Sequence, residues 1–170
     1  MTRENESLIW TPSPEEVEKE RDWINTEILE IGLEKLESLA TIASEARRRS
    51  YSPYSKYQVG AALLTVSGEE AAGQNIEIVT FSETGHAEEQ ATKNAVSSGA
   101  VEKNGRKFIR AVAVSHEGDT APCGRCRQII SEFSDNSLVV VADDEGKIRS
   151  VTSIKTLLPY SFTPSDLGIE

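Results

Sequence analysis

Side chains that bind metal ions and move protons are concentrated in two short stretches of this 170-residue chain. His86 and Glu88 lie in GHAEEQ at 85–90, and Cys123 and Cys126 lie in APCGRC at 121–126. The chain has only two histidines and two cysteines, so abundance does not explain this grouping. One imidazole and two thiolates form a three-ligand set that leaves a fourth position open on Zn²⁺, which is the pattern of catalytic zinc sites.

Glu88 adds a proton carrier to this pattern. It lies too close to His86 in the sequence to be the obvious fourth ligand, but it is placed to reach a water that the metal activates. A carboxylate there takes a proton from the water and passes it to a departing amine. Together with Pro122, these residues match H-x-E…P-C-x-x-C, the signature of the zinc-dependent nucleobase deaminases.

Each of these residues also has an ordinary interpretation when it is taken alone. A histidine that opens a helix commonly caps it, and a buried cysteine packs as a small apolar residue. The C-x-x-C pair is also compatible with redox chemistry, although redox pairs follow the first strand of a βαβ unit and this one comes late. The combination favours the metal site. His116, in SHEGD at 115–119, lacks such neighbours and is predicted to be an exposed turn residue.

Strands and helices alternate around the two stretches. Residues 86–98 and 123–133 are rich in helix formers, and Gly99 is placed to end the first helix. The β-branched, nearly uncharged segments 109–115 and 137–143 predict buried strands. The other predicted elements are a helical pattern with a break near Gly32, two strands around a turn, and a final short helix, at 13–46, 57–81 and 153–159. This order predicts an α/β fold around one mixed sheet.

The composition narrows the classes of partner. Lys and Arg number 18 against 28 Asp and Glu, which gives a formal net charge of −10. Nucleic acids are disfavoured because their binding requires clustered positive charge, and the basic cluster at 47–49 is predicted to be a solvated helix end. No stretch is apolar enough to span a membrane, and because the N-terminus is polar and acidic we expect no secretory signal there. We therefore expect a cytoplasmic protein.

Beyond the zinc motif, the sequence resembles the cytidine deaminases from about Leu39 to Leu167. SPYSKYQVGAALLTVSG at 52–68 is similar to that family's first strand, GQNIE at 73–77 to its nucleoside-binding turn, and LLPYSFTPSDL at 157–167 to its C-terminal end. The resemblance implies a three-layer α/β/α fold, a Zn²⁺ cofactor, and hydrolytic deamination of cytidine and 2′-deoxycytidine. Residues 35–170 would form the catalytic domain, preceded by a partly helical extension at 1–34.

The resemblance also implies roles for individual residues. Glu88 would carry a proton from the attacking water to N3 of the pyrimidine and then to the departing ammonia. The residues that would contact the nucleoside are Asn75 and Glu77 at the 3′-hydroxyl side of the ribose, Tyr57 and Phe162 as aromatic neighbours of the base, and Ala87 through its backbone N–H at the pyrimidine O2.

Departures from the family pattern bear on the site and on the assembly. Single-domain members often carry Cys at the position of His86 and Arg at that of Glu89. An imidazole in place of a third thiolate leaves the site less negative, which removes the need for the Arg. Ile78 and Phe81 replace the more usual Asn and Tyr at positions near the subunit contacts of tetrameric members. We expect a homo-oligomer, with a tetramer favoured over a dimer.

Two other functions stay open on the sequence alone. One is deamination of another aminopyrimidine nucleoside or of blasticidin S, for which the residues at 78 and 81 leave room. The other is a non-catalytic, zinc-stabilised binding protein. Glu88 disfavours the second, because a structural site has no use for a carboxylate directed at an open metal position.

Overall fold

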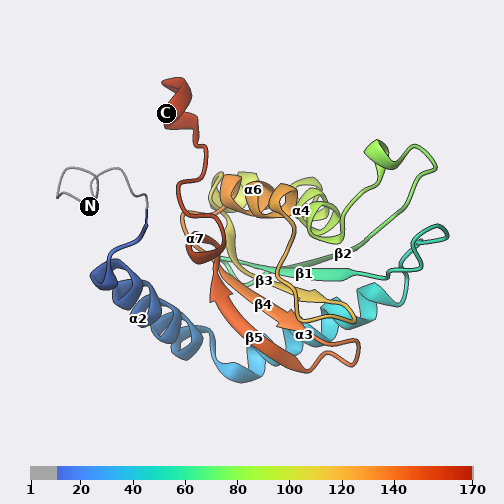
Figure 1. Cartoon of the computed structure of the whole chain (residues 1–170), viewed down its shortest axis with the longest axis horizontal. Helices are drawn as coiled ribbons and strands as arrows, with labels where there is room; N and C mark the ends of the chain where they lie inside the picture. The colour runs from blue at the N-terminus through green and yellow to red at the C-terminus, as the bar shows by residue number, and fades with distance from the viewer. Residues whose placement is uncertain (1–10, 170) are drawn as a thin grey trace, which may run out of the picture.

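A five-stranded mixed sheet forms the centre of the molecule; the structure, a computed structural model, describes residues 11–169 (Figure 1). The strands are β1 Gly60–Thr65, β2 Glu70–Gln74, β3 Ile109–Ser115, β4 Leu138–Ala142 and β5 Ile148–Ser153. They lie in the order β2-β1-β3-β4-β5. β3 and β4 are parallel and the other neighbours are antiparallel, which confirms the predicted mixed sheet.

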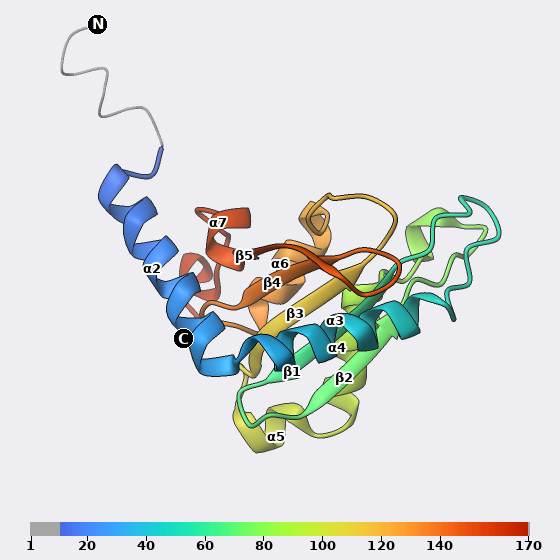
Figure 2. The ribbon, with the colours of Figure 1, turned by 90° about the horizontal axis from the view of Figure 1, so that it is seen from below.

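Helices cover both faces of this sheet and make three layers (Figures 1 and 2). α3 Leu33–Arg47 packs on one face, and α4 Ala87–Ser97 and α6 Gly124–Glu132 pack on the other. The more peripheral elements are α2 Pro14–Ile31, α5 Ala100–Asn104, α7 Ile154–Leu157 and two 3₁₀ turns, Phe81–Glu83 and Pro164–Leu167. The predicted α/β/α fold is confirmed.

The central strands divide the core into two halves. In β3, Val112 and Val114 face α4 and α6, whereas Ala111 and Ala113 face α3. Successive strand residues point to opposite faces, and helices bury both faces, so both sets of residues are apolar. This double burial explains why 109–115 and 137–143 could be predicted as strands from uninterrupted apolar runs.

Close packing of helices on the sheet depends on two glycines. A Cβ atom at Gly60 would lie 2.1 Å from the carbonyl oxygen of Ala43 in α3, and one at Gly73 would lie 2.3 Å from the backbone nitrogen of Ala91 in α4. The missing side chains let both helices approach the sheet closely. Gly73 also affects the position of His86. Because α4 begins directly after His86, the distance between α4 and β2 determines where His86 lies.

Most of the described part of the predicted N-terminal extension is helical. Its first ten residues lie outside the described range, and α2 occupies 14–31. Gly32, with a φ of 86°, separates α2 from α3, as the sequence pattern predicted. Arg110 of β3 joins α2 to the sheet through Glu27 and Glu30 at 3.0 and 2.8 Å. Within residues 11–169, no helix combines the length and the apolar character needed to cross a membrane.

Three features differ from the sequence-based expectations. β5 was not predicted, because its polar residues lie on a half-exposed edge of the sheet. The short α5, which follows Gly99 directly, was also not predicted. Arg47 is not solvated as expected: it is 8% exposed, and its guanidinium contacts the Gln58 carbonyl and the Glu117 carboxylate at 3.2 and 3.0 Å.

Candidate active site

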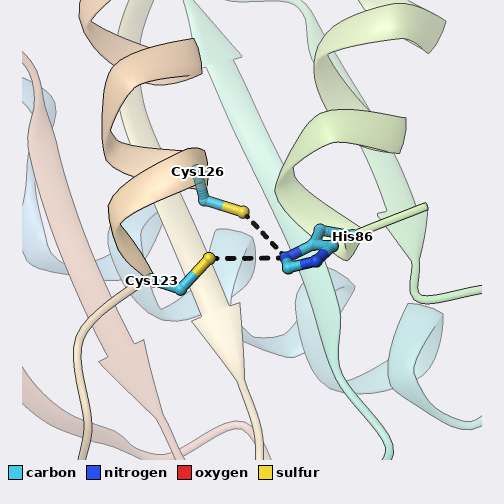
Figure 3. A group of neighbouring side chains, drawn as sticks. All are labelled: His86, Cys123 and Cys126. Carbon is cyan, nitrogen blue, oxygen red and sulfur yellow. Dashed lines mark hydrogen bonds between the residues drawn. The ribbon is translucent and has the colours of Figure 1, made fainter. Parts of the chain in front are cut away.

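The N-termini of two helices meet and bring together His86, Cys123 and Cys126, which we call the ligand cluster (Figure 3). His86 is the N-cap residue of α4, Cys123 is the N-cap residue of α6, and Cys126 lies in the first turn of α6. Helix N-termini present unpaired N–H groups and the positive end of the helix dipole. Both effects stabilise thiolates, which are the ligand form of cysteine.

The geometry of the ligand cluster fits a zinc-sized ion. The Nδ1 atom of His86 lies 3.4 Å from the Sγ atoms of both Cys123 and Cys126, and all three ligand atoms lie within 4.8 Å of one another. Tetrahedral ligands at ordinary Zn–N and Zn–S distances are about 3.6 Å apart. One imidazole nitrogen and two sulfurs also form a donor set that suits zinc, whereas magnesium and calcium prefer oxygen ligands.

Glu88 lies beside the ligand cluster and affects its electrostatics. Its side chain is buried, with 6% of the residue exposed. Burial of Cys126 raises the pKa of its thiol, and the charge of Glu88 and the neighbouring Cys123 raise that pKa further. A divalent cation reverses this preference and deprotonates a coordinating thiol. The chain has therefore gathered groups that require a cation to hold their charges together.

A cavity of about 320 Å³ adjoins the ligand cluster. His86, Glu88 and Cys123 line it, together with residues from the segments 55–59, 75–77 and 114–122. Ala87 lines it too, and as the first residue of α4 its backbone N–H has no acceptor within the helix. A molecule in this cavity would meet both the ligand cluster and polar groups from the loops.

The turn that carries Asn75 and Glu77 is fixed next to His86. Ile76 exchanges two backbone hydrogen bonds of 3.0 Å with Gly85, the residue before His86. On the other side, the Glu77 N–H donates to the Tyr51 carbonyl at 2.8 Å. The turn therefore lies between two neighbouring segments, and its position relative to the ligand cluster is set by backbone contacts.

Glu77 is held as an oriented carboxylate. It accepts hydrogen bonds from the Ser55 hydroxyl and from the backbone N–H groups of Tyr54 and Ser55, the latter two at 2.9 and 3.1 Å. The Ser55 hydroxyl contributes most to holding the pKa of Glu77 below its ordinary value, and the two N–H groups act in the same direction. Glu77 therefore lines the cavity as an acceptor of hydrogen bonds.

The Asn75 carboxamide braces the neighbouring loop. Its Oδ1 accepts from the Ser50 hydroxyl at 2.5 Å and from the Val59 N–H at 2.9 Å, and its Nδ2 donates to the Tyr57 carbonyl at 2.9 Å. These bonds use both lone pairs of the oxygen and one of the two N–H groups. The second N–H is the part of Asn75 that a ligand in the cavity can engage.

Comparison with known proteins identifies the family. The chain matches the family described as "Cytidine and deoxycytidylate deaminase zinc-binding region" over residues 33–142. The chain belongs to this family. The cytidine deaminase of Sporosarcina psychrophila is 42% identical over 135 residues, which span 78% of this chain and 95% of that protein. The cytidine deaminase of Halalkalibacterium halodurans is 37% identical over 129 residues, which span 74% and 92%.

A solved structure supports the same assignment. The crystal structure of cytidine deaminase from Burkholderia pseudomallei matches with a TM-score of 0.66 at 36% identity, covering 74% of this chain and 97% of that one. The family and the fold that were expected from the sequence of this chain are thus confirmed.

His116 is not the exposed turn residue that the sequence predicted. It is 4% exposed and lines the cavity. The expectation was wrong because His116 directly follows β3, a buried strand, so its side chain lies at the end of the core where the loop to α6 begins. Its position after a buried strand was the available signal, since the loops that follow such strands commonly form ligand sites in α/β folds.

Glu89 and Arg125 form a second contact between the two ligand-bearing helices. The Glu89 carboxylate accepts from the His86 N–H at 3.4 Å, and it pairs with Arg125 at 2.8 Å and Lys93 at 2.7 Å. Burial acts to raise the pKa of Glu89, but Lys93, the His86 N–H and Arg125 outweigh it and hold that pKa below its ordinary value. In the sequence, Glu89 was noted only because family members often have Arg at that position. Arg125, which lies between the two cysteines, was overlooked.

Phe162 is not brought to the cavity. It lies in the segment after α7, is 60% exposed, and is absent from the residues that line the cavity. The Phe162 carbonyl accepts a hydrogen bond from the Gln128 side chain at 2.9 Å. Its expected role near the base stays a prediction. The structure does bring the other predicted nucleoside residues to the cavity, namely Tyr57, Asn75, Glu77 and Ala87.

Proposed function

We propose that this family member hydrolyses cytidine and 2′-deoxycytidine to uridine and 2′-deoxyuridine with release of ammonia. The observation that carries the proposal is a single cavity lined by a buried carboxylate, Glu88, by members of the ligand cluster, and by Asn75 and Glu77. Glu88 is suited to proton transfer at a reacting centre, and Asn75 and Glu77 are suited to hydrogen bonds with the hydroxyls of a sugar. The relatives named cytidine deaminase support the same substrate class.

The ligand cluster would hold Zn²⁺ through Nδ1 of His86 and the sulfurs of Cys123 and Cys126. When bound, zinc supplies a nucleophilic water at neutral pH by lowering the pKa of that water. Three protein ligands leave a position for the water, as catalysis requires. The helix N-termini at His86 and Cys123 support the thiolate charges; Cys126 is buried, whereas Cys123 is exposed.

Glu88 moves the protons in both halves of the reaction. Its carboxylate takes a proton from the water as the new bond to C4 of the pyrimidine forms, and it delivers that proton to N3. It then takes the second proton from the hydroxyl group now on C4 and transfers it to the exocyclic nitrogen as the C4–N bond breaks. Ammonia leaves and a carbonyl group remains at C4. One carboxylate serves both steps, because it is regenerated between them.

The remaining residues orient the nucleoside. The ribose 3′-hydroxyl would donate its proton to Glu77 and accept the second N–H of Asn75. A substrate that lacks this hydroxyl leaves the second N–H of Asn75 unpaired and removes one donor from Glu77, which discriminates against that substrate. The Ala87 N–H would bind the pyrimidine O2, and Tyr57 would form part of the wall along the base.

We also propose that the protein is a cytoplasmic homo-oligomer, with a tetramer favoured, that acts on free nucleosides. Apolar side chains near the nucleoside turn support the oligomer: Val79 is 72% and Phe81 is 68% exposed, and Phe81 packs edge-on against Tyr54. The net charge of −10 disfavours nucleic acid as a substrate. Light scattering on the eluting protein should give the mass of four chains, and the mass of one chain would contradict the proposal.

Ammonia release from cytidine, 2′-deoxycytidine, cytosine and blasticidin S tests the proposed reaction. We expect the zinc-loaded protein to turn over both nucleosides and to leave free cytosine nearly untouched. E88Q, which keeps the size of the side chain but cannot carry protons, should retain zinc and lose roughly 10²- to 10⁴-fold in kcat. Turnover of blasticidin S alone would move the substrate to that class, and zinc binding without any turnover would favour a binding protein.

A further inference from the structure

His116 and Tyr57 join two walls of the cavity across 59 positions of sequence. The Tyr57 hydroxyl and Nδ1 of His116 lie 2.9 Å apart, and both residues line the cavity. Tyr57 precedes β1, and His116 opens the loop of residues 116–122 that leads from β3 to α6. This loop also supplies Thr120, Ala121 and Pro122 to the cavity lining.

The hydrogen bonds around His116 determine which nitrogen carries its proton. The backbone N–H of Gly118 also donates to Nδ1, at 2.9 Å, so Nδ1 is an acceptor. Nε2 lies 2.8 Å from the Thr120 carbonyl oxygen, which can only accept, so Nε2 carries the proton. With Nδ1 committed as an acceptor, the Tyr57 hydroxyl donates to it. The neutral ring thus ties Tyr57 to both Gly118 and Thr120.

A second contact braces the same two walls. Arg47, which is buried, donates to the carbonyl of Gln58, the residue after Tyr57, and pairs with Glu117, the residue after His116. Tyr57 is 42% exposed, so packing alone does not fix its ring. Its hydroxyl is already bonded to His116, and therefore the ring meets a bound molecule as a flat, oriented surface.

We propose that His116 is a positioning residue for nucleoside binding: it fixes the Tyr57 ring and the 116–122 loop as one rigid wall of the cavity. The inference rests on the proposed function and deepens it. A phenylalanine at position 57 would need no such partner, whereas the hydroxyl of Tyr57 and the imidazole of His116 act as a pair in this chain. Without the imidazole, the Tyr57 hydroxyl would lack its fixed acceptor at the cavity wall.

Four variants test the pair: H116L, H116N, Y57F and the double variant Y57F/H116L. H116L removes the acceptor and keeps similar bulk, whereas H116N keeps an acceptor oxygen near the position of Nδ1. H116L should raise KM for cytidine roughly 3- to 10-fold, the range expected for one hydrogen bond, with kcat changed less than about twofold. H116N should recover most of the loss. In the Y57F background, H116L should raise KM by a smaller factor than in the wild type, because only the contacts of the ring with Gly118 and Thr120 remain to be lost.

Zinc content, thermal melting and nitrogen-15 NMR of the histidine rings complete the test. The chain has only two histidines, so the ring signals of His116 can be assigned with H116N. We expect a neutral ring protonated at Nε2, with an Nδ1 signal that shifts in Y57F. An equal rise in KM from H116L in both backgrounds, an unchanged KM, or a collapse of kcat with zinc loss would overturn the inference. Absence of cytidine turnover in the wild type, with the NMR signature intact, would instead overturn the proposed function and leave the Tyr57–His116 pair in place.

Discussion

The ligand cluster and the segments 50–59 and 75–77, which we call the nucleoside segments, are held in place in different ways. His86, Cys123 and Cys126 lie at the first turns of α4 and α6, and these helices are fixed by packing on the sheet. The nucleoside segments contain little regular structure. Their positions depend on hydrogen bonds such as those of Asn75 to Ser50, Tyr57 and Val59.

This difference agrees with the role that we propose for each region. A metal ion requires ligand atoms placed within a few tenths of an ångström, and rigid helix ends on a packed core provide that accuracy. Substrate-binding residues commonly lie on loops, which accept sequence changes that alter specificity without disturbing the core. Changes in the ligand cluster should therefore abolish activity, whereas changes in the nucleoside segments should produce graded effects on substrate binding and selectivity.

The largest effect is expected from C126A. Loss of a hydrogen-bonding partner of a metal ligand lowers metal affinity roughly 10- to 100-fold. Loss of the ligand itself should lower the affinity further, and activity should fall to background. Metal analysis and ammonia release measure the two effects. E88Q is the matched control, because it should lose turnover and keep zinc. Because C126A also alters a buried side chain, removal of the metal from the wild type by a chelator should abolish activity reversibly. Full activity in metal-free protein would contradict the role of the ligand cluster.

E77Q should produce a smaller and more selective loss. In the wild type, the Glu77 carboxylate would accept a hydrogen bond from the 3′-hydroxyl. Loss of a hydrogen bond to a charged group should lower kcat/KM for cytidine roughly 10- to 100-fold. The wild type should discriminate strongly against 3′-deoxycytidine, and E77Q should discriminate much less. E83Q, at an exposed carboxylate of the neighbouring 3₁₀ turn, is the matched control and should behave as the wild type. Equal discrimination by E77Q and the wild type would remove Glu77 from ribose recognition.

The same contrast explains which residues could be predicted from the sequence. The ligand cluster and Glu88 were identified because metal chemistry restricts residue types and spacing, and helix starts preserve that spacing in space. The central strands were identified because burial on both faces makes them uniformly apolar. The half-exposed β5 was missed, since its sequence, IRSVTS, carries no apolar run and its pairing with β4 depends on the completed sheet.

Contacts between distant segments could not be predicted in this way. The bond between Tyr57 and His116 and the ion pair between Glu89 and Arg125 each join residues more than 30 positions apart. Neither pair has a local spacing that marks it, and each exists only because the sheet places the two segments together. For this reason His116 was mistaken for an exposed residue, and Arg125 was overlooked although it lies between two identified cysteines.

The Glu89–Arg125 pair tests whether the ligand cluster depends on more than helix packing. R125A removes the charged contact between α4 and α6, and it should weaken zinc binding about 10-fold, the low end of the range for partners of metal ligands. Competition with a chelating dye measures this affinity. R149A is the matched control. Arg149 pairs with Asp119 at 2.9 Å and with Asp143 at 3.6 Å, and neither carboxylate contacts Glu89 or belongs to the ligand cluster. An equal zinc affinity in R125A and R149A would show that packing alone positions the helices.

The smallest effect concerns the acid stability that Glu77 contributes to its segment. The pKa of Glu77 is lower in the folded protein than its ordinary value of 4.5, chiefly through the Ser55 hydroxyl. A carboxyl group with a depressed pKa favours the folded state above its unfolded pKa, and this contribution is lost as the pH falls through the lower folded value. Thermal melting should therefore show the wild type more stable than E77Q at neutral pH, by a margin that closes below about pH 4.5. A margin that widens on acidification would mean that the hydrogen bonds to Glu77 do not favour its charged form, and would remove the basis for treating it as an oriented acceptor in the cavity.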